Sequence, residues 1–505
     1  MGLFGALNVS SSGLSANQAA LETSGNNIAN VNTDGYSRQE VDMEEQPTVY
    51  MAGTGNMGTG VNVKKVTRDV DDYVRSEVRD ANSKEEYYST ESTELGDLED
   101  TLNEPSDNGL TTQLSTLTTA WNTLASDPDL STAKATVVED AATFTDSLNQ
   151  VAKDITSLQT NITSTLAEDV SSFNSDIDQL QTINKQIYTL VIQGQTPNDL
   201  LDERDSLLKD ASTYAGITTS FDDYGRASIS IDGQSILTAD SKNSLSVVTA
   251  STSSGSTIAK DGDTNEGLEQ VSDDYDTNTL LLTSTDSSGN TSYSTLSISE
   301  GKIGGLVDAS SEIGSRLQEL NNFAETLGKA VNTVYTDGAS STAGFFDLGS
   351  DDNYAENISV NSTLDNNPDL LKSGTSTASG DSSIATAMVN LADAKLDYPI
   401  TASELSSFDS STLSFTSSST GTTFSEAYSN IVTKNAISKN QADTLASSQS
   451  TVLTTLENQD QSVSGVSLTE EISDIIRYQH GYEANANVLN TISEMLDTLI
   501  NKTGA

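Results

Sequence analysis

The first 31 residues carry apolar side chains at a seven-residue interval and have Glu22 as their only charged side chain. The row consists of Leu7, Leu14, Leu21 and Ile28. Apolar residues with this spacing fall on one face of a helix. The pattern therefore predicts an amphipathic helix at the start of the chain.

A second heptad pattern closes the chain. Its main row is Leu468, Ile475, Tyr482, Leu489 and Leu496, and its second row contains Ile472, Ala486 and Ile500. Gln479 and Ser493 interrupt the second row. Heptad rows at both ends predict that the terminal helices pair as a coiled coil. Ordinary core helices of a bundle would show the same spacing, so that alternative stays open.

Helical spacing also fills much of the interior. It starts at Val66 and Val70 and continues to Leu102, before Glu104-Pro105. It returns from Ala141 to Val191, a helix of roughly 75 Å at 1.5 Å per residue. Further helices are expected from the Thr196-Pro197-Asn198-Asp199 start to Gly216, and within 301–338 and 422–464. Helices of this length predict a rod.

Two polar stretches separate these helices. From Ile217 the apolar period becomes two, with Ala227, Ile229 and Ile231 alternating with serines before the Asp232-Gly233 turn. That alternation predicts a β-hairpin. The stretch 217–300 is therefore expected to form a small β domain, and Ile358 and Val360 indicate strands in the second stretch, 339–421.

These patterns predict an α+β multidomain fold with a terminal coiled coil, a long helical bundle and inserted β-rich outer domains. We expect an N-terminal coiled-coil helix and extended turn segment over 1–64, and a C-terminal coiled-coil helix over 465–505. The expected helical rod domain has three parts, at 65–216, 301–338 and 422–464. The expected insertions are the β-rich 217–300 and the polar, β-leaning 339–421.

Charge and composition narrow the function. Asp and Glu number 74 against 24 Lys and Arg, a net charge of -50, which argues strongly against nucleic acid or an anionic membrane surface as partner. Such a charge fits a salt-rich habitat or an alkaline one. The chain has no cysteine. It also shows neither the pattern of a cleaved signal peptide nor an apolar run long enough to span a membrane.

The sequence offers little catalytic or metal-binding chemistry. His480 is the single histidine and lies in the last heptad pattern, where an interface role is expected. The segment 261–267 resembles a calcium loop, but its glycine is displaced and Ser272 replaces the closing Glu, so we interpret it as a solvated acidic turn. We predict no catalytic, cofactor or metal site and no enzyme.

A run rich in asparagine and glycine follows the first helix, from Ser24 to Gln39. Asn26, Asn27 and Asn30 can hydrogen-bond local amides, and Gly35 permits a positive φ before Tyr36, so this run ends the helix and turns the chain. It resembles the signature of the bacterial flagellar axial family of rod, hook and hook-associated proteins.

Three further stretches narrow the resemblance to the hook-associated members of that family. They are 103–128, which contains Trp121, the segment 198–205, and 464–486 near the end of the chain. The insertions fit the resemblance only by position. Thr118-Thr119 and Lys134 depart from the family's usual residues, which affects the expected packing of one helix.

The resemblance implies a structural adaptor joining the flagellar hook to the filament and assembling as a ring. Implied partners are the chain itself, the hook protein, a second hook-filament junction protein, the flagellar export apparatus and an export chaperone. The implied location is the extracellular hook-filament junction. Another axial protein, or an adhesin or hydrolase on a flagellar scaffold, stays open as an alternative. The expected assembly interface comprises Leu7, Leu14, Leu21, Asn26, Asn27, Ile28, Asn30, Gly35, Tyr36, Leu468, Ile472, Ile475, Tyr482, Ala486, Leu489 and Leu496.

Overall fold

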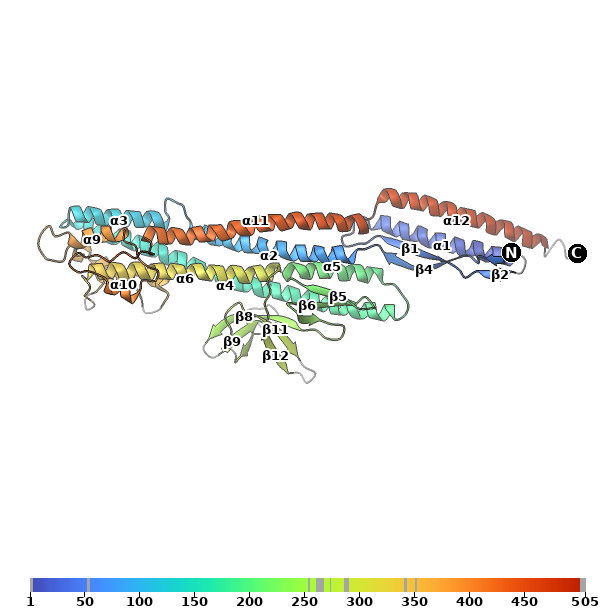
Figure 1. Cartoon of the computed structure of the whole chain (residues 1–505), viewed down its shortest axis with the longest axis horizontal. Coiled ribbons are helices and arrows are strands. Elements are labelled where there is room, and N and C mark those ends of the chain that lie inside the picture. Colours follow the sequence, from blue (N-terminus) through green and yellow to red (C-terminus); the bar gives the residue numbers. More distant parts are fainter. Residues whose placement is uncertain are drawn as a thin grey trace.

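The computed structural model describes residues 3–51, 55–252, 255–259, 268–272, 274–285, 290–339, 343–349 and 352–499. The molecule is elongated, with a helical rod along its length and a small sheet to one side (Figure 1). The first and last helices lie beside each other at one end of the rod. This arrangement confirms the expected fold class of long helices with inserted β-rich regions.

Six long helices form the rod. They are α2 (Asp72–Leu102), α3 (Leu110–Ser126), α4 (Ser131–Val191), α5 (Asn198–Tyr214), α6 (Gly301–Tyr335) and α11 (Phe424–Ser464). The predicted interior helices are all present. Helix α4 begins ten residues before Ala141 and, at 61 residues, is about 90 Å long.

Local capping signals set where two of these helices begin. The Asp71 carboxylate accepts hydrogen bonds from the backbone N–H groups of Tyr73 and Val74 at the start of α2. Thr423 and Glu426 form a reciprocal capping box at the start of α11. Each cap satisfies N–H groups that have no partner within their own helix.

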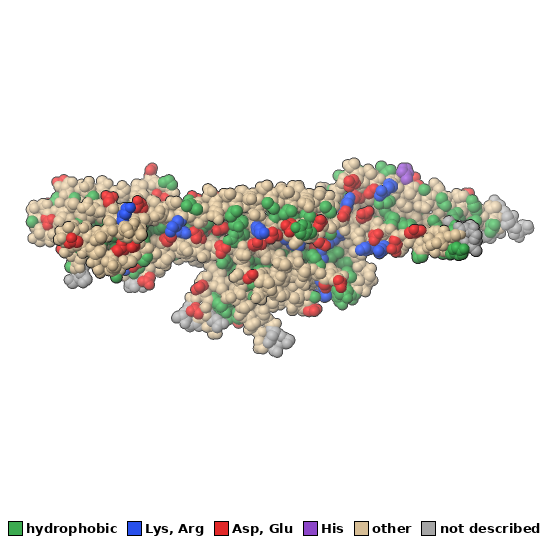
Figure 2. Space-filling model, viewed as in Figure 1, with side chains coloured by type: hydrophobic (Ala, Val, Ile, Leu, Met, Phe, Trp, Pro, Cys, Tyr) green, Lys and Arg blue, Asp and Glu red, His purple; other side chains and the backbone are tan. Residues whose placement is uncertain are grey.

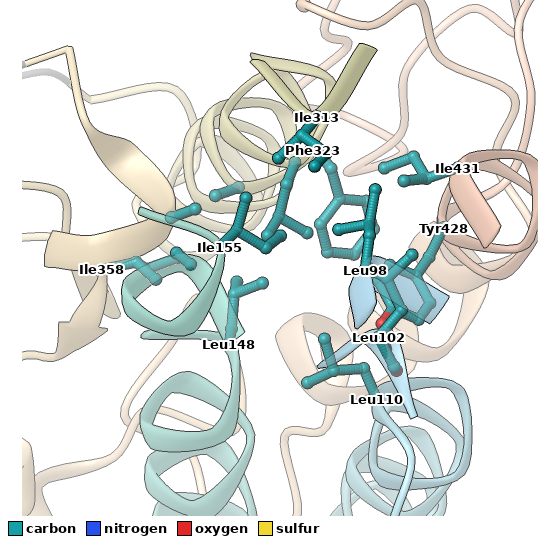
Figure 3. Close-up of a cluster of buried hydrophobic side chains, with 14 of the residues drawn as sticks. Leu98, Leu102, Leu110, Leu148, Ile155, Ile313, Phe323, Ile358, Tyr428 and Ile431 are labelled. Carbon is teal, nitrogen blue, oxygen red and sulfur yellow. Dashed lines mark hydrogen bonds between the residues drawn. The ribbon is translucent and has the colours of Figure 1, made fainter. Parts of the chain in front are cut away.

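The core of the rod forms where helices far apart in sequence converge. Figure 3 shows side chains of α2, α3, α4, α6 and α11 pointing toward one another, together with Ile358 from the second insertion. Phe323 and Tyr428 are fully buried there, and the Tyr428 hydroxyl donates to the Leu102 carbonyl oxygen over 3.2 Å. Trp121 packs edge-on against Phe345, with ring centroids 5.4 Å apart.

The first insertion contains two sheets. Strands β5 (Thr218–Phe221), β6 (Ala227–Ile231) and β7 (Gln234–Leu237) form one antiparallel sheet. The other has the order β10-β9-β8-β11-β12, with bounds β8 Ser244–Thr252, β9 Gly255–Ala259, β10 Leu268–Val271, β11 Leu280–Thr285 and β12 Thr291–Thr295. The predicted hairpin is confirmed, because Asp232 and Gly233 turn between β6 and β7 with φ of 48° and 74°. The segment 261–267 lies outside the described residues.

In the second insertion the regular elements are mostly short helices joined by irregular segments, so the expectation that 339–421 leans towards β structure is wrong for its described residues. Ile358 and Val360 lie at the two-residue strand β14 (Ser359–Val360), which pairs with β13 (Phe346–Asp347). Around them lie α7 Tyr354–Asn357, α8 Ser362–Asn366, the 3₁₀ helix Pro368–Leu370, α9 Ser383–Ala392 and α10 Ala402–Ser406. Ser and Thr content misled the sequence interpretation, because these residues also favour helix starts and turns.

A β ribbon follows the first helix along the chain, before α2, and lies beside that helix (Figure 1). Its strands are β1 Gln39–Glu45, β2 Val49–Met51, β3 Gly55–Met57 and β4 Val61–Arg68, paired as β1-β4 and β2-β3. Val66 therefore lies in a strand, and Val70 precedes α2, so placing both in the first interior helix was wrong. Alternating β-branched residues in β4 explain the strand. The expected division between residues 64 and 65 also falls inside β4.

Candidate assembly interface

The two chain ends form one structural unit. Helix α1 (Leu3–Ala29) packs along α12 (Leu468–Asp497), and the ribbon β1–β4 packs against α1 (Figure 1). We call α1, α12 and this ribbon the terminal unit. It contains nearly all the predicted interface residues.

The buried row of α1 is not the leucine row. Its fully buried positions have small or amide side chains, namely Ser10, Gly13, Ala16, Ala20, Ser24 and Asn27. The predicted Leu7, Leu14, Leu21 and Ile28 are only half-buried. Within the chain, small residues thus mediate the closest helix contact, and the leucine row keeps accessible apolar surface.

Helix α12 leaves even more apolar surface exposed. Leu468 is 47% exposed and Ile472 52% exposed, and neighbouring Ile476 is 51% exposed. Five other predicted residues are half-buried, namely Ile475, Tyr482, Ala486, Leu489 and Leu496, whereas Ile500 lies outside the described residues. Figure 2 shows green apolar side chains on the visible face of this unit. Such surface marks an interaction site more often than a free face.

The two terminal helices cross closely at reciprocal glycine–asparagine pairs. A Cβ at Gly13 would lie 2.9 Å from the Asn485 amide, and one at Gly481 would lie 2.5 Å from Asn17 Oδ1. Each asparagine donates from Nδ2 to the carbonyl oxygen of the glycine four residues earlier in its own helix, over 2.6 Å and 2.9 Å. Each helix thus offers a glycine surface to the other helix's asparagine.

Gly481→Leu should separate α1 from α12. Overpacking of this kind costs about 1–3 kcal/mol, because Asn17 and the facing helix must move. We expect faster amide hydrogen exchange in both terminal helices, measured by mass spectrometry. Gly25→Leu is the matched control, since nothing lies within 4 Å of a Cβ at Gly25. Equal exchange in the two variants would contradict the close crossing.

Asn27 connects the first helix, the turn and the last helix. Its Oδ1 accepts from the Tyr36 hydroxyl over 2.8 Å and from the Gln39 N–H over 3.0 Å. Its Nδ2 donates to the Gln39 carbonyl oxygen over 2.9 Å and to Glu471 Oε1 over 3.0 Å. Both polar atoms of this buried amide are therefore satisfied twice, and they fix the turn to the start of α12.

The rest of the predicted turn is built as its residue types suggest. Asn30 donates from Nδ2 to the Asn26 carbonyl oxygen over 3.0 Å, and Gly35 has a φ of 76°. Burial, and then the nearby carboxylate of Asp202, raises the pKa of Tyr36 to about 12. Tyr36 thus stays a neutral hydrogen-bond donor over the ordinary pH range.

A cluster of buried ion pairs joins the terminal unit to the rod. Asp205 on α5 accepts from Arg204 over 2.5 Å, Arg75 over 2.7 Å and Arg68 over 2.9 Å. Asp202, one turn earlier, accepts from Arg68 over 2.8 Å. Arg68 ends β4 and Arg75 lies in α2. The two aspartates of α5 therefore hold the ribbon against the rod helices α5 and α2.

Val66 of the ribbon and two residues just before it, Ser37 and Arg38, form further hydrogen bonds here. The Ser37 hydroxyl donates to Asp202 Oδ1 over 2.6 Å, and Asn198 Nδ2 donates to the Val66 carbonyl oxygen over 3.1 Å. The Arg38 N–H donates to the Ser464 carbonyl oxygen at the end of α11, over 2.8 Å. The segment 198–205, noted in the sequence as the start of a helix and for its resemblance, thus holds the ribbon.

Electrostatics favour the ionised form of Asp205. Burial alone would raise its pKa, but the guanidinium groups of Arg204, Arg68 and Arg75 lower it below its ordinary value. Its side chain is only 8% exposed, so little water screens these pairs. Sequence reasoning missed the cluster. One signal was available, since four of the chain's eight arginines, Arg38, Arg68, Arg75 and Arg79, lie within 38–79, and Arg204 adjoins Asp205.

His480 lies on the exposed surface of α12, with Nδ1 3.8 Å from the Glu483 carboxylate. Among the described residues no group of three His, Cys, Asp or Glu side chains could hold a metal ion. In that same part of the chain, no helix combines the length and apolar character needed to cross a membrane.

Comparison with models of protein families shows which family the chain belongs to. Residues 95–349, just over half of the chain, match the helical domain of the flagellar hook-associated protein FlgK. The chain belongs to the FlgK family of flagellar hook-associated proteins. Residues 7–36 match the flagella basal body rod protein family, and residues 459–502 match the C-terminal family of the flagellar basal body rod proteins FlgEFG. The resemblance drawn from the turn and the last helix is confirmed.

Individual relatives extend the FlgK similarity over nearly the whole chain. Flagellar hook-associated protein 1 of Bacillus subtilis (strain 168) is 29% identical, covering 97% of this chain and 96% of its own. The protein of the same name from Escherichia coli (strain K12) is 27% identical, covering 98% and 99%. The FlgK family is one of structural flagellar proteins, so membership places this chain in the flagellum.

A solved structure supports the fold. The flagellar hook junction protein FlgK from Burkholderia pseudomallei superposes with a TM-score of 0.57 at 13% identity. The match covers 77% of this chain and 100% of that one. At this identity the likeness concerns the fold alone.

Proposed function

We propose that this chain is a structural adaptor that joins the bacterial flagellar hook to the filament. Copies assemble side by side as a ring, with the terminal units as its innermost layer. The main support for this assembly is the apolar surface that the terminal unit leaves accessible, above all Leu468, Ile472 and Ile476 on α12. Burial of that surface between copies would stabilise the ring.

The proposed partners follow from this position. The ring contacts the hook protein at one end and a second junction protein at the other. The chain leaves the cell through the flagellar export apparatus, with an export chaperone, and reaches the extracellular hook-filament junction. Its net charge of -50 argues against nucleic acid or an anionic membrane as partner.

The role is proposed to be non-catalytic. Family membership supports this, and the single histidine is exposed, with the Glu483 carboxylate 3.8 Å from its Nδ1. We also propose that the domains divide near residues 216, 300, 338, 421 and 464. Several long helices end near these positions, including α5 at Tyr214, α6 at Tyr335 and α11 at Ser464.

Deleting the gene should leave hooks without filaments in electron micrographs. The full chain, supplied from a plasmid, should restore filaments, whereas a chain ending at Ser467 should not, because it lacks α12. Normal filaments in the deletion strain would contradict the junction role and favour an accessory adhesin or hydrolase. Filaments restored by the shortened chain would contradict assembly through the terminal unit.

A further inference from the structure

The β1–β4 ribbon displays two adjacent lysines through a β-bulge. In a regular strand, successive side chains point to opposite faces. Here the pairing slips, since Asp42 lies opposite Lys65 whereas Met43 lies opposite Val63. Lys64 is the extra residue of the bulge, and Lys64 and Lys65 are both exposed. Bulges often redirect side chains at functional positions.

These lysines carry charge that the fold does not neutralise. Lys64-Lys65 is the only pair of adjacent Lys or Arg residues in a chain of net charge -50. Among the described residues, no carboxylate lies within the 4.0 Å ion-pair distance of either ammonium group, although Asp42 faces Lys65 across the ribbon. Both charges are therefore available to a carboxylate from outside the chain.

Large apolar side chains extend the same ribbon. Met43 is 36% exposed, Val49 57% and Tyr50 74%. Figure 2 shows basic and acidic side chains on the ribbon, with apolar ones towards its far end. Met43 lies next to the bulge, opposite Val63, whereas Val49 and Tyr50 lie further along the ribbon, in the β2–β3 pair. Exposed apolar side chains and unpaired positive charge on one ribbon have the composition of a protein–protein contact rather than of an ordinary solvated edge.

We infer that the ribbon of one copy docks, through Lys64, Lys65 and the Val49–Tyr50 corner, onto a carboxylate-bearing surface of a neighbouring copy. Two observations favour a second copy. Each copy carries 74 acidic side chains against 24 basic ones, so a neighbour's surface is complementary in charge to the two lysines. The ribbon also packs against α1, so it belongs to the same terminal unit as the proposed assembly surface of α12.

This contact rests on the proposed ring and explains how it tolerates charge. Copies of net charge -50 repel one another, and salt screens that repulsion only in part. Two lysines on every copy place positive charge at the contact between neighbours. They also select the orientation in which the ribbon, rather than an acidic rod surface, faces the next copy.

The variant Lys65→Cys tests directly which protein lies against the ribbon, because a label attached to this cysteine reacts nowhere else in a chain that has no other thiol. The variant is labelled with a benzophenone maleimide, allowed to assemble on isolated hooks, irradiated and examined by gel electrophoresis and mass spectrometry. The contact predicts a cross-linked dimer of this chain in assemblies but not in the dilute monomer. A cross-link to a different axial protein, or none at all, would overturn it.

Reversing the charge of the two lysines tests how much they contribute to the contact between copies. Lys64→Glu with Lys65→Glu should lower the fraction of hooks that carry filaments by about tenfold, and the loss should shrink as salt rises. The control is Lys153→Glu with Lys185→Glu, two exposed lysines on α4. Equal effects of the two pairs, or none, would overturn the ribbon contact while leaving the adaptor role intact. Absence of the wild-type chain from flagella would overturn the adaptor role and the contact together.

Discussion

Replacing Leu468, Ile472 and Ile476 with serine should abolish the joining of filaments to hooks while leaving the monomer folded. These side chains are 47%, 52% and 51% exposed, so the fold of a single chain depends little on them. If neighbouring copies cover these side chains in the ring, each substitution removes roughly 1 kcal/mol of apolar burial at every interface between copies. The loss repeats at every subunit contact, so assembly should fail.

The readouts are electron micrographs of the deletion strain carrying the variant, and the far-ultraviolet circular dichroism of the purified chain. Ile437→Ser with Val452→Ser is the matched control, since these residues are 61% and 44% exposed on α11, outside the terminal unit. Normal filaments from the triple variant would show that α12 does not form the assembly surface.

Periodicity predicted the rod well because its helices bury one continuous stripe. Every turn of α4 between Val137 and Ile187 places a side chain in the core, so the 3.6-residue period persists over the whole helix. Nearly three turns at its start escaped prediction, since Ser131 and Thr132 begin the helix among polar and small residues. Pattern finds the middle of an element more reliably than its ends.

The same reasoning found the terminal helices but not the face that joins them. The heptads made the leucine rows stand out, whereas the closest contact in the chain uses Gly13 and Gly481 with their asparagine partners. A hydrophobic row shows which face avoids water and not what covers it. A close helix crossing requires small side chains, which carry almost no hydrophobic signal.

The cluster of buried ion pairs around Asp205 produces no periodic pattern in the sequence. Asp205 meets Arg68 and Arg75 across more than a hundred residues of sequence, and only the fold shows that they are neighbours. The ribbon was missed for a related reason, because a few alternating residues in β4 adjoin a much longer helical pattern. Long-range polar contacts must be read from structure.

Asp205→Ala should reduce the free energy of unfolding by about 3–5 kcal/mol, because removing one partner leaves buried charges uncompensated. Three arginines would lose their shared carboxylate. Arg68 would keep Asp202 and Arg75 would keep Asp460, whereas Arg204 would keep no carboxylate partner among the described residues. The measurement is guanidinium unfolding followed by circular dichroism. Glu203→Ala, an exposed position on the same helix, should change stability by less than about 0.5 kcal/mol.

Acid titration gives the same contact an independent signature. The pKa of Asp205 in the folded chain lies below the ordinary 3.8, so its stabilisation is complete above that value and is lost as pH falls through the folded pKa. Asp205→Asn keeps the side-chain volume but cannot titrate. Below about pH 4 its stability should therefore fall less steeply than that of the wild-type chain. If stability fell in parallel with pH for the two chains, the arginines would not hold the Asp205 carboxylate ionised. The contact of α5 with the ribbon and α2 would then depend on packing alone.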